Sequence, residues 1–219
     1  MSDRRDFLGL AVAATAVAAV PAGSAPPQLP AAAAAGGSVR RISRIQLQSP
    51  ETMPELFRWL EPLRPGAAQS NLFRSLANCP DILRAFIPMA DMVRTGEGID
   101  PRLRELAIIM VCQTIGTSYE HGRHWNMALK AEVSREKLQA LWDFESSNLF
   151  APVEKAVLRL ARDASRAPNQ ISESVWNDVQ QSLGDRQSLA LLFSIGWYNM
   201  TGRLTGALQL QDEPGFARL

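Results

Sequence analysis

The stretch PRLRELAIIMVCQTIGTSYEHGRHWNMALK, residues 101–130, decides how this chain folds. Asp100, just before it, can cap a helix, and Pro101 suits the first helical position. Leu103 and residues 106–111 are then apolar and cover nearly all sides of the expected helix. A helix of this kind is covered on most faces, so we expect it to be central. Gly116 predicts a break, after which a second helix follows over residues 119–132.

The remaining chain from residue 50 onward also has helical periodicity, and no alternating strand pattern is evident. Three helical runs fill the C-terminal third, at residues 152–167, 172–184 and 186–210. The last is almost wholly apolar up to Tyr198, which predicts a second central helix. Earlier in the chain, one buried helical stripe is expected from Leu72, Phe73, Leu76, Ile82, Leu83, Phe86 and Ile87. The sequence therefore predicts an all-α, single-domain helical bundle.

The N-terminal residues have a different character. Residues 1–25 carry Arg4 and Arg5 before a short apolar run, which resembles a twin-arginine signal peptide. Residues 26–40 are mostly Pro, Ala and Gly and are expected to be a disordered linker, so the folded domain should span 41–219. This pattern predicts a periplasmic or exported protein that uses the twin-arginine export machinery. An uncleaved signal anchor is the alternative.

Composition narrows the classes of function. The chain has 23 basic and 22 acidic residues and a formal charge of +1, which argues against a nucleic-acid binding protein. Two cysteines, Cys79 and Cys112, are expected to be buried structural thiols. Export to an oxidising compartment keeps a disulfide between them as the alternative.

Both histidines of the chain, His121 and His124, lie three positions apart in the second helix of the opening stretch. Glu120 and His124 are four apart and share a face of that helix. A metal site is one interpretation, but the order EHxxH is not the zinc-protease signature and no further histidine exists to complete it. Two histidines on a solvated face are a second interpretation. The third is acid/base chemistry, in which Glu105 turns inward to hold one histidine.

Residues 101–141 resemble the core of the carboxymuconolactone decarboxylase family, which includes the alkyl hydroperoxidase D proteins. The resemblance extends from about residue 54 to 210, and it implies an alkyl hydroperoxidase D-like fold. The family's peroxidase branch carries a glutamate, two cysteines and a histidine at fixed spacing. In this chain Glu105 and His124 match that glutamate and histidine, but Thr117 and Glu120 stand where the cysteines would be. A disulfide-cycling mechanism lacks its two thiols here.

The resemblance to the cysteine-free branch implies a lyase that decarboxylates a carboxylated lactone without metal or organic cofactor. It implies that His124 is the general acid/base, that Glu105 orients it or relays the proton, and that Glu120 is a second carboxylate beside it. His121 is expected to be a neighbour without a chemical role. Weaker candidates for binding the substrate's oxygen atoms are Tyr119, Tyr198 and Arg203. Three other arginines are expected to be surface charges: Arg102, Arg104 and Arg123.

Other functions stay open at this point. They are a hydroperoxidase-type redox protein that lacks the usual cysteine pair, a non-catalytic oligomeric binding protein, and a metal enzyme. The resemblance also implies a homo-oligomer. An exported protein would not meet a muconolactone made in the cytoplasm, so the small-molecule substrate could equally be another lactone, a β-keto acid or a related carbonyl acid, which the enzyme would decarboxylate or isomerise.

Overall fold

The structure, a computed structural model, describes residues 43–95 and 98–213. The expected signal peptide and linker, residues 1–40, lie outside these described residues. Within them, every regular element is helical, as the sequence predicts, and none of the helices is long and apolar enough to cross a membrane. The α-helices are α1 (Pro54–Leu60), α2 (Asn71–Leu76), α3 (Pro80–Thr95), α4 (Pro101–Ile115), α5 (Ser118–Lys130), α6 (Arg135–Gln139), α7 (Pro152–Arg166) and α8 (Glu173–Leu208).

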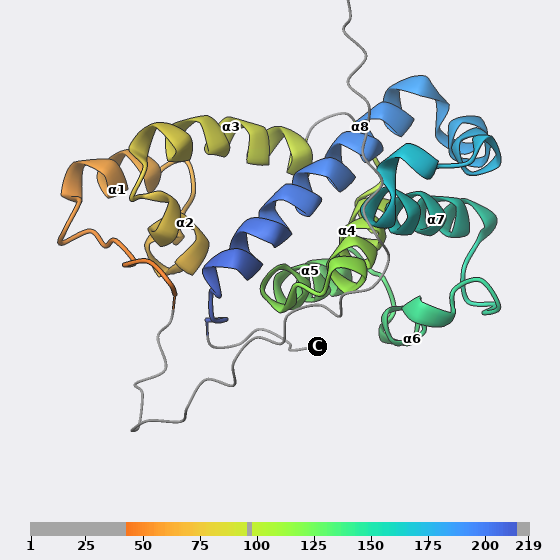
Figure 1. Cartoon of the computed structure of the whole chain (residues 1–219), viewed down its shortest axis with the longest axis horizontal. Coiled ribbons are helices and arrows are strands. Elements are labelled where there is room, and N and C mark those ends of the chain that lie inside the picture. Colours follow the sequence, from red (N-terminus) through yellow and green to blue (C-terminus); the bar gives the residue numbers. More distant parts are fainter. Residues whose placement is uncertain (1–42, 96–97, 214–219) are drawn as a thin grey trace, which may run out of the picture. The chain divides into compact units, whose positions relative to one another are not determined.

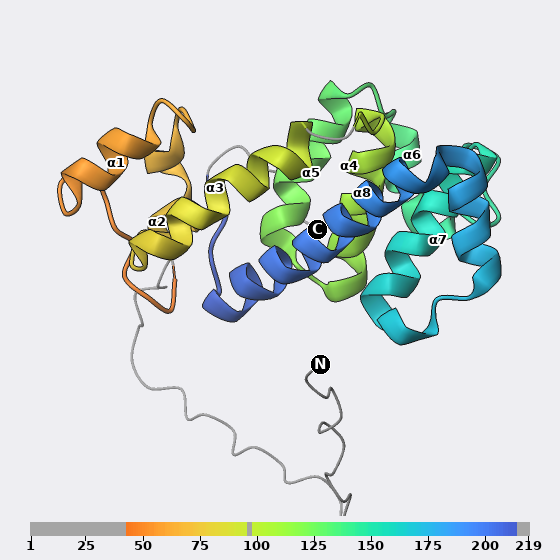
Figure 2. The same cartoon turned by 90° about the horizontal axis from the view of Figure 1, so that it is seen from above.

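Helix α4 is the central helix, as predicted. It packs against α5, α7 and α8, which surround it in Figures 1 and 2. The Asp100 side chain caps it by accepting a hydrogen bond from the backbone N–H of Arg102. Gly116 ends it in the left-handed conformation at φ 72°, which glycine adopts without steric cost. The chain thus turns directly into α5, and this turn sets α5 against α4.

The buried apolar side chains form two clusters. The larger one joins α4, α7 and α8, and its centre includes Leu106, Ile109 and Leu158, which are all but inaccessible to solvent. The smaller one joins α1, α2 and α3. Trp197 of α8 packs against both, and its ring centroid lies 4.6 Å from that of Phe86 on α3. This contact helps to hold α3 against α8.

Helix α8 differs from the expectation of a second central helix. Gly184, at φ 73°, interrupts its helical geometry, which agrees with the break predicted after residue 184. Beyond the break, Leu189 is 66% exposed and Phe193 42% exposed, so part of the apolar surface of α8 is uncovered. The apolar run misled because apolar side chains on an outer face leave the same sequence pattern as a buried helix. Ile82, expected in the buried stripe of α3, is likewise exposed.

Gly202 of α8 lies close to the turn between α4 and α5. A Cβ atom on this residue would lie 2.7 Å from Cδ1 of Ile115 and 2.9 Å from Cγ2 of Thr117. We expect Gly202→Ala to destabilise the protein by about 1–3 kcal/mol, because overpacking forces side chains or backbone to shift. Urea unfolding measures this. Gly206→Ala, one turn on where a Cβ meets open space, is the matched control and should not destabilise. Equal losses in both variants would contradict the steric explanation.

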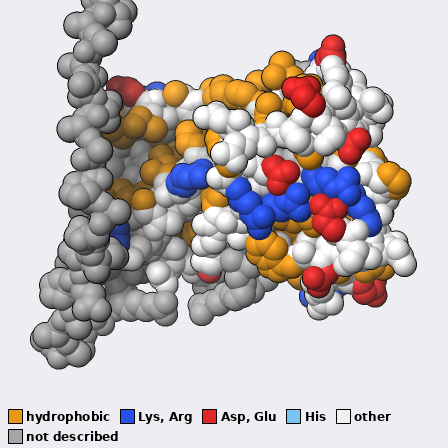
Figure 3. All heavy atoms as spheres, turned by 45° about the vertical axis from the view of Figure 1, so that its right-hand side comes forward, with side chains coloured by type: hydrophobic (Ala, Val, Ile, Leu, Met, Phe, Trp, Pro, Cys, Tyr) orange, Lys and Arg blue, Asp and Glu red, His pale blue; other side chains and the backbone are white. Residues whose placement is uncertain are grey.

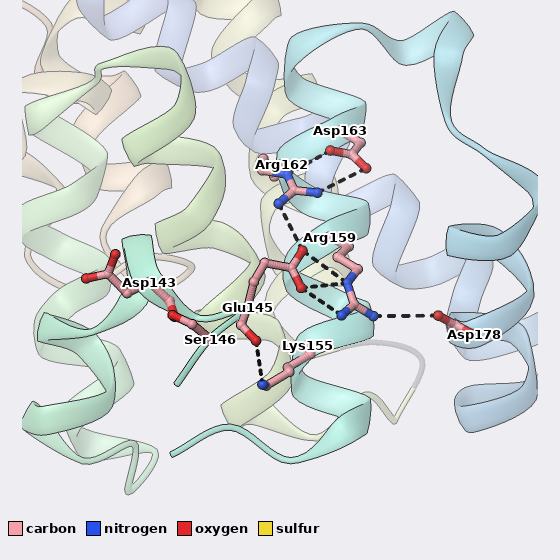
Figure 4. A network of polar contacts seen from close by, with 8 residues as sticks. All are labelled: Asp143, Glu145, Ser146, Lys155, Arg159, Arg162, Asp163 and Asp178. Carbon is pink, nitrogen blue, oxygen red and sulfur yellow. Dashed lines mark hydrogen bonds and ion pairs between the residues drawn. The ribbon is translucent and has the colours of Figure 1, made fainter. Parts of the chain in front are cut away.

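Charged side chains lie in a band on one face of the molecule, with basic and acidic groups interspersed (Figure 3). On α7, Arg159 and Arg162 donate to the carboxylate of Glu145, at 2.7 and 3.1 Å, and Lys155 donates to its backbone carbonyl (Figure 4). Arg159 also lies 3.7 Å from Asp178 of α8. This network ties the loop before α7 to α7 and α8.

Candidate functional site

Glu105 of α4 and His124 of α5 form a buried pair. The Glu105 Oε2 and His124 Nδ1 atoms are 2.6 Å apart, and the two side chains are 2% and 5% exposed. A carboxylate can only accept, so Nδ1 carries the hydrogen and the Nε2 atom is the one available for proton transfer. Glu105 is therefore turned inward, and the interpretation of two histidines on a solvated face is wrong: His121 is buried as well.

Glu120 lies on the other side of the same imidazole. Its Oε2 atom is 3.9 Å from Nε2 of His124, and its Oε1 atom is buried with no hydrogen-bond partner among the described residues. Burial raises the pKa of the Glu120 carboxyl above 4.5, and the nearby His124 opposes this shift. His124 thus lies between two carboxyl groups in different environments, one directly hydrogen-bonded to it and one that burial favours in its protonated form.

The burial of Glu120 predicts a pH-dependent effect of Glu120→Gln. A carboxyl whose pKa is raised by folding destabilises the folded state when it is ionised, and this cost disappears as the pH falls through the folded-state pKa towards 4.5. The neutral amide lacks the cost at every pH. We expect the variant to be more stable than the parent near pH 7.5, with an advantage that shrinks to nearly nothing below about pH 4.5. Urea unfolding across this range measures it, and a pH-independent difference would contradict the expectation.

Tyr198 of α8 completes the cluster around His124. The two rings meet edge to face with centroids 4.5 Å apart, and Tyr198 is 5% exposed. Burial raises the pKa of the Tyr198 hydroxyl, and the charges of Glu120 and Glu105 add to the effect. The phenol therefore stays protonated and can donate a hydrogen bond to a developing negative charge.

Cys112 faces the same cluster, which the sequence analysis did not foresee. It follows Glu105 by seven positions on α4, two helical turns, and this spacing was the available signal. It is fully buried, and burial together with the charges of Glu120 and Glu105 raises the pKa of its thiol. Cys79, expected to be buried, is instead exposed at the start of α3, and both cysteines are free.

The structure does not bring Tyr119 and Arg203 into this cluster. The Tyr119 hydroxyl accepts a hydrogen bond from the backbone N–H of Leu72 and donates to Glu213, both at 2.9 Å. It therefore ties α5 to α2 and to the segment that follows α8. Arg203 is exposed, and its guanidinium donates to Asn199 one turn earlier on α8. On a helix, Tyr198 and Arg203 point about 140° apart, so they cannot both face His124.

Two of the arginines expected at the surface are largely buried. Arg104 has its Nε atom 3.5 Å from Oε1 of Glu105, and Arg123 is paired with Glu213. Arg102 is exposed and pairs with Asp100, as expected for a surface charge. Arg104 thus places a positive charge beside the carboxylate that holds His124.

His121 is only 2% exposed, and neither ring nitrogen has a hydrogen-bond partner among the described residues. Its ring lies 5.5 Å from that of Trp125. Burial and the charge of His124 lower the pKa of His121 to about 4, so the ring is neutral at physiological pH. His121 is therefore a neutral buried neighbour of His124.

The described residues contain no group of three or more His, Cys, Asp or Glu side chains placed to hold a metal ion. Among them, one cavity of about 350 Å³ lies between the end of α3 and the middle of α8, with Val93 and Ser194 in its wall. A second cavity, of about 450 Å³, lies between α7 and α8 beside Lys155 and Arg159. In this second cavity, Lys155 and Arg159 already donate hydrogen bonds to Glu145. The first cavity is the better candidate for binding a ligand, because Ser194 in its wall lies one helical turn before Tyr198.

Comparison with known proteins agrees with this architecture. The debrominase Bmp8, as a cysteine-to-alanine variant in complex with 2,3,4-tribromopyrrole, superposes with a TM-score of 0.68 at 20% identity, covering 78% of this chain and 94% of that one. An uncharacterised peroxidase-related protein from Silicibacter gives 0.67 at 18% identity, covering 83% and 97%. A Ralstonia eutropha protein described as an alkylhydroperoxidase AhpD core gives 0.65 at 16% identity, covering 80% and 95%. At these identities the likeness concerns the fold alone.

No curated protein matches the sequence significantly. The model of the carboxymuconolactone decarboxylase family matches residues 80–163, which contain α3, α4, α5 and most of α7, and thus the elements that carry Glu105, Glu120 and His124. Residues 80–163 therefore match the model of the carboxymuconolactone decarboxylase family, and the described residues have an alkyl hydroperoxidase D-like fold.

Proposed function

We propose that this protein is a cofactor-free enzyme that transfers a proton to or from carbon in a small carboxylated lactone or related carbonyl acid, as a decarboxylating lyase or an isomerase. The observation that carries the proposal is the buried pair of Glu105 and His124, with 2.6 Å between their facing atoms. A histidine held by a carboxylate has a fixed tautomer and orientation, which suits general acid/base work. Tyr198 beside it is a neutral donor at the same place.

Decarboxylation needs a hydrogen-bond donor for the enolate oxygen and an acid that protonates the carbon, and in this proposal Tyr198 and His124 have these two roles. When the bond between the carboxylate and its carbon breaks, carbon dioxide leaves and the electron pair moves into the conjugated carbonyl, which becomes an enolate. Tyr198 donates a hydrogen bond to that oxygen. His124, protonated at Nε2, then gives its proton to the carbon, and solvent returns the proton to the ring. The sum is a carboxylate plus one proton converted to carbon dioxide and the protonated product. Isomerisation uses the same ring to remove a proton and return it elsewhere.

The two cysteines, Cys79 and Cys112, give less support to a redox function than the Glu105–His124 pair gives to acid/base catalysis. Thr117 and Glu120 occupy the positions of the family's cysteine pair, and Thr117 is buried with its hydroxyl 3.4 Å from that of Thr205. Cys112 keeps its proton because burial raises its pKa, and the thiolate is the reactive form. Cys79 lies at the surface. We propose also that the protein acts as a homo-oligomer after export, on the basis of the sequence pattern in residues 1–25 and the family resemblance.

The test is a substrate panel: carboxymuconolactone, a β-keto acid and a γ-lactone without a carboxylate. Ultraviolet absorbance, carbon dioxide release and deuterium uptake at carbon from D₂O are followed for the mature protein. Carbon dioxide release with deuterium uptake supports the lyase, and deuterium exchange alone supports the isomerase. A folded protein with neither activity would overturn the proposal and favour a non-catalytic binding protein.

A further inference from the structure

Arg64 is a buried arginine in the turn that follows α1. It is 9% exposed, and its Nη2 atom lies 2.7 Å from Oδ1 of Asp91 on α3. Its Nε atom is buried and has no hydrogen-bond partner among the described residues. A buried guanidinium with an unused donor is costly unless a ligand or another group completes its hydrogen bonds.

Arg94 lies one turn after Asp91 on α3, so both are on one side of that helix, beside Arg64. Burial, and then the charge of Arg94, lower the pKa of Arg64, yet arginine remains protonated in proteins. Among the described residues, Asp91 is the carboxylate within ion-pair distance of Arg64. The three groups together therefore have one positive charge in excess.

This group of charges lies beside the cluster around His124. The charge of Arg94 lowers the pKa of the Tyr198 hydroxyl, which opposes the effect of its burial. Arg94 lies on α3 and Tyr198 on α8, and these two helices lie side by side in Figures 1 and 2. The cavity of about 350 Å³ has Val93, next to Arg94, and Ser194, one turn before Tyr198, in its wall.

We propose that Arg64 and Arg94 form a binding subsite for the carboxylate of a small organic acid, beside Tyr198 and the cavity between α3 and α8. The inference deepens the proposed function, on which it rests, by naming the groups that hold the substrate. The planar guanidinium donates two parallel hydrogen bonds to a carboxylate, and one ligand carboxylate balances the excess charge. The subsite takes the role that the sequence analysis gave to Arg203.

The probe is cis,cis-muconate, a conjugated dicarboxylate, titrated into the full mature protein by calorimetry at low salt. We expect binding that weakens with added salt and at least about tenfold weaker binding to Arg94→Gln, because a charge-assisted hydrogen bond is lost. Arg94 is exposed, so this variant should keep its fold. Arg64→Gln should weaken binding as well, and thermal melting verifies that it remains folded. Arg84→Gln, an exposed position earlier on α3, is the matched control and should bind like the parent.

Three results would each overturn the subsite. The first is that the parent and Arg94→Gln bind muconate with equal affinity, and the second is that the parent binds the dimethyl ester of muconate as tightly as muconate itself. The third is that the parent does not bind muconate. This test of the subsite can be distinguished from the test of the proposed function. Muconate binding that depends on Arg94, without turnover of any panel compound, would leave the subsite standing and remove the enzyme. Turnover with an unchanged KM in Arg94→Gln would do the reverse.

Discussion

Replacing His124 by glutamine is expected to lower kcat by roughly 10²–10⁴-fold, the usual contribution of a positioned acid or base. Glutamine has a similar size and can still pair with Glu105, but it cannot carry a proton at neutral pH. The loss should therefore appear in kcat with little change in KM, because His124 acts on the reacting carbon rather than on the bound carboxylate. Steady-state kinetics on the substrate that turns over in the panel measure it.

Glu105→Gln is the companion variant. It keeps an oxygen acceptor for Nδ1 of His124 but removes the negative charge beside the ring, so we expect a smaller loss of kcat than in His124→Gln. Cys79→Ser, at an exposed site, should retain full activity, whereas a mechanism that cycles the two cysteines through a disulfide would lose it. Full activity in His124→Gln would show that the proton travels by another group, with Glu120 the nearest candidate.

Acid should destabilise the protein through His121. Folding lowers the pKa of this histidine from 6.5 to about 4, so the unfolded chain binds a proton more readily than the folded protein does. The contribution of the neutral buried ring to the free energy of unfolding is complete above pH 6.5 and is lost progressively as the pH falls to about 4. A pKa shift of this size corresponds to a loss of roughly 3 kcal/mol. Below that pH no further loss arises from this group.

The prediction is measured as a difference between pH profiles. The free energy of unfolding is determined by urea titration between about pH 4 and 7.5 for the parent and for His121→Phe, which keeps an aromatic ring without a titrating nitrogen. The variant should lose about 3 kcal/mol less than the parent over this range. Because Glu120 shifts in the opposite sense, Glu120→Gln should steepen the profile rather than flatten it. Parallel profiles for the parent and His121→Phe would contradict the assignment.

Part of the site was accessible from sequence because it depends on one short connection. Glu105 and His124 are separated by 19 residues, and the pair was expected from the family resemblance. Their meeting depends on Gly116, which ends α4 and sets α5 against it. The position of Cys112 beside this cluster was not predicted, although its spacing from Glu105 on α4 places both residues on one face of the helix. Tyr198 was named together with Tyr119 and Arg203, and nothing local distinguished the three.

The sequence by itself determined the all-helical fold, the Asp100 cap, the breaks at Gly116 and Gly184, and the burial of α4. Capping residues, glycines and apolar spacing act over a few neighbouring positions. Only the tertiary structure decided that α8 leaves Leu189 and Phe193 exposed, that Tyr198 faces His124 while Arg203 points away, and that Arg64 is buried beside α3. The physical reason is that the burial and the electrostatic environment of a side chain depend on the residues packed around it. Here those residues come from helices that are distant in the chain.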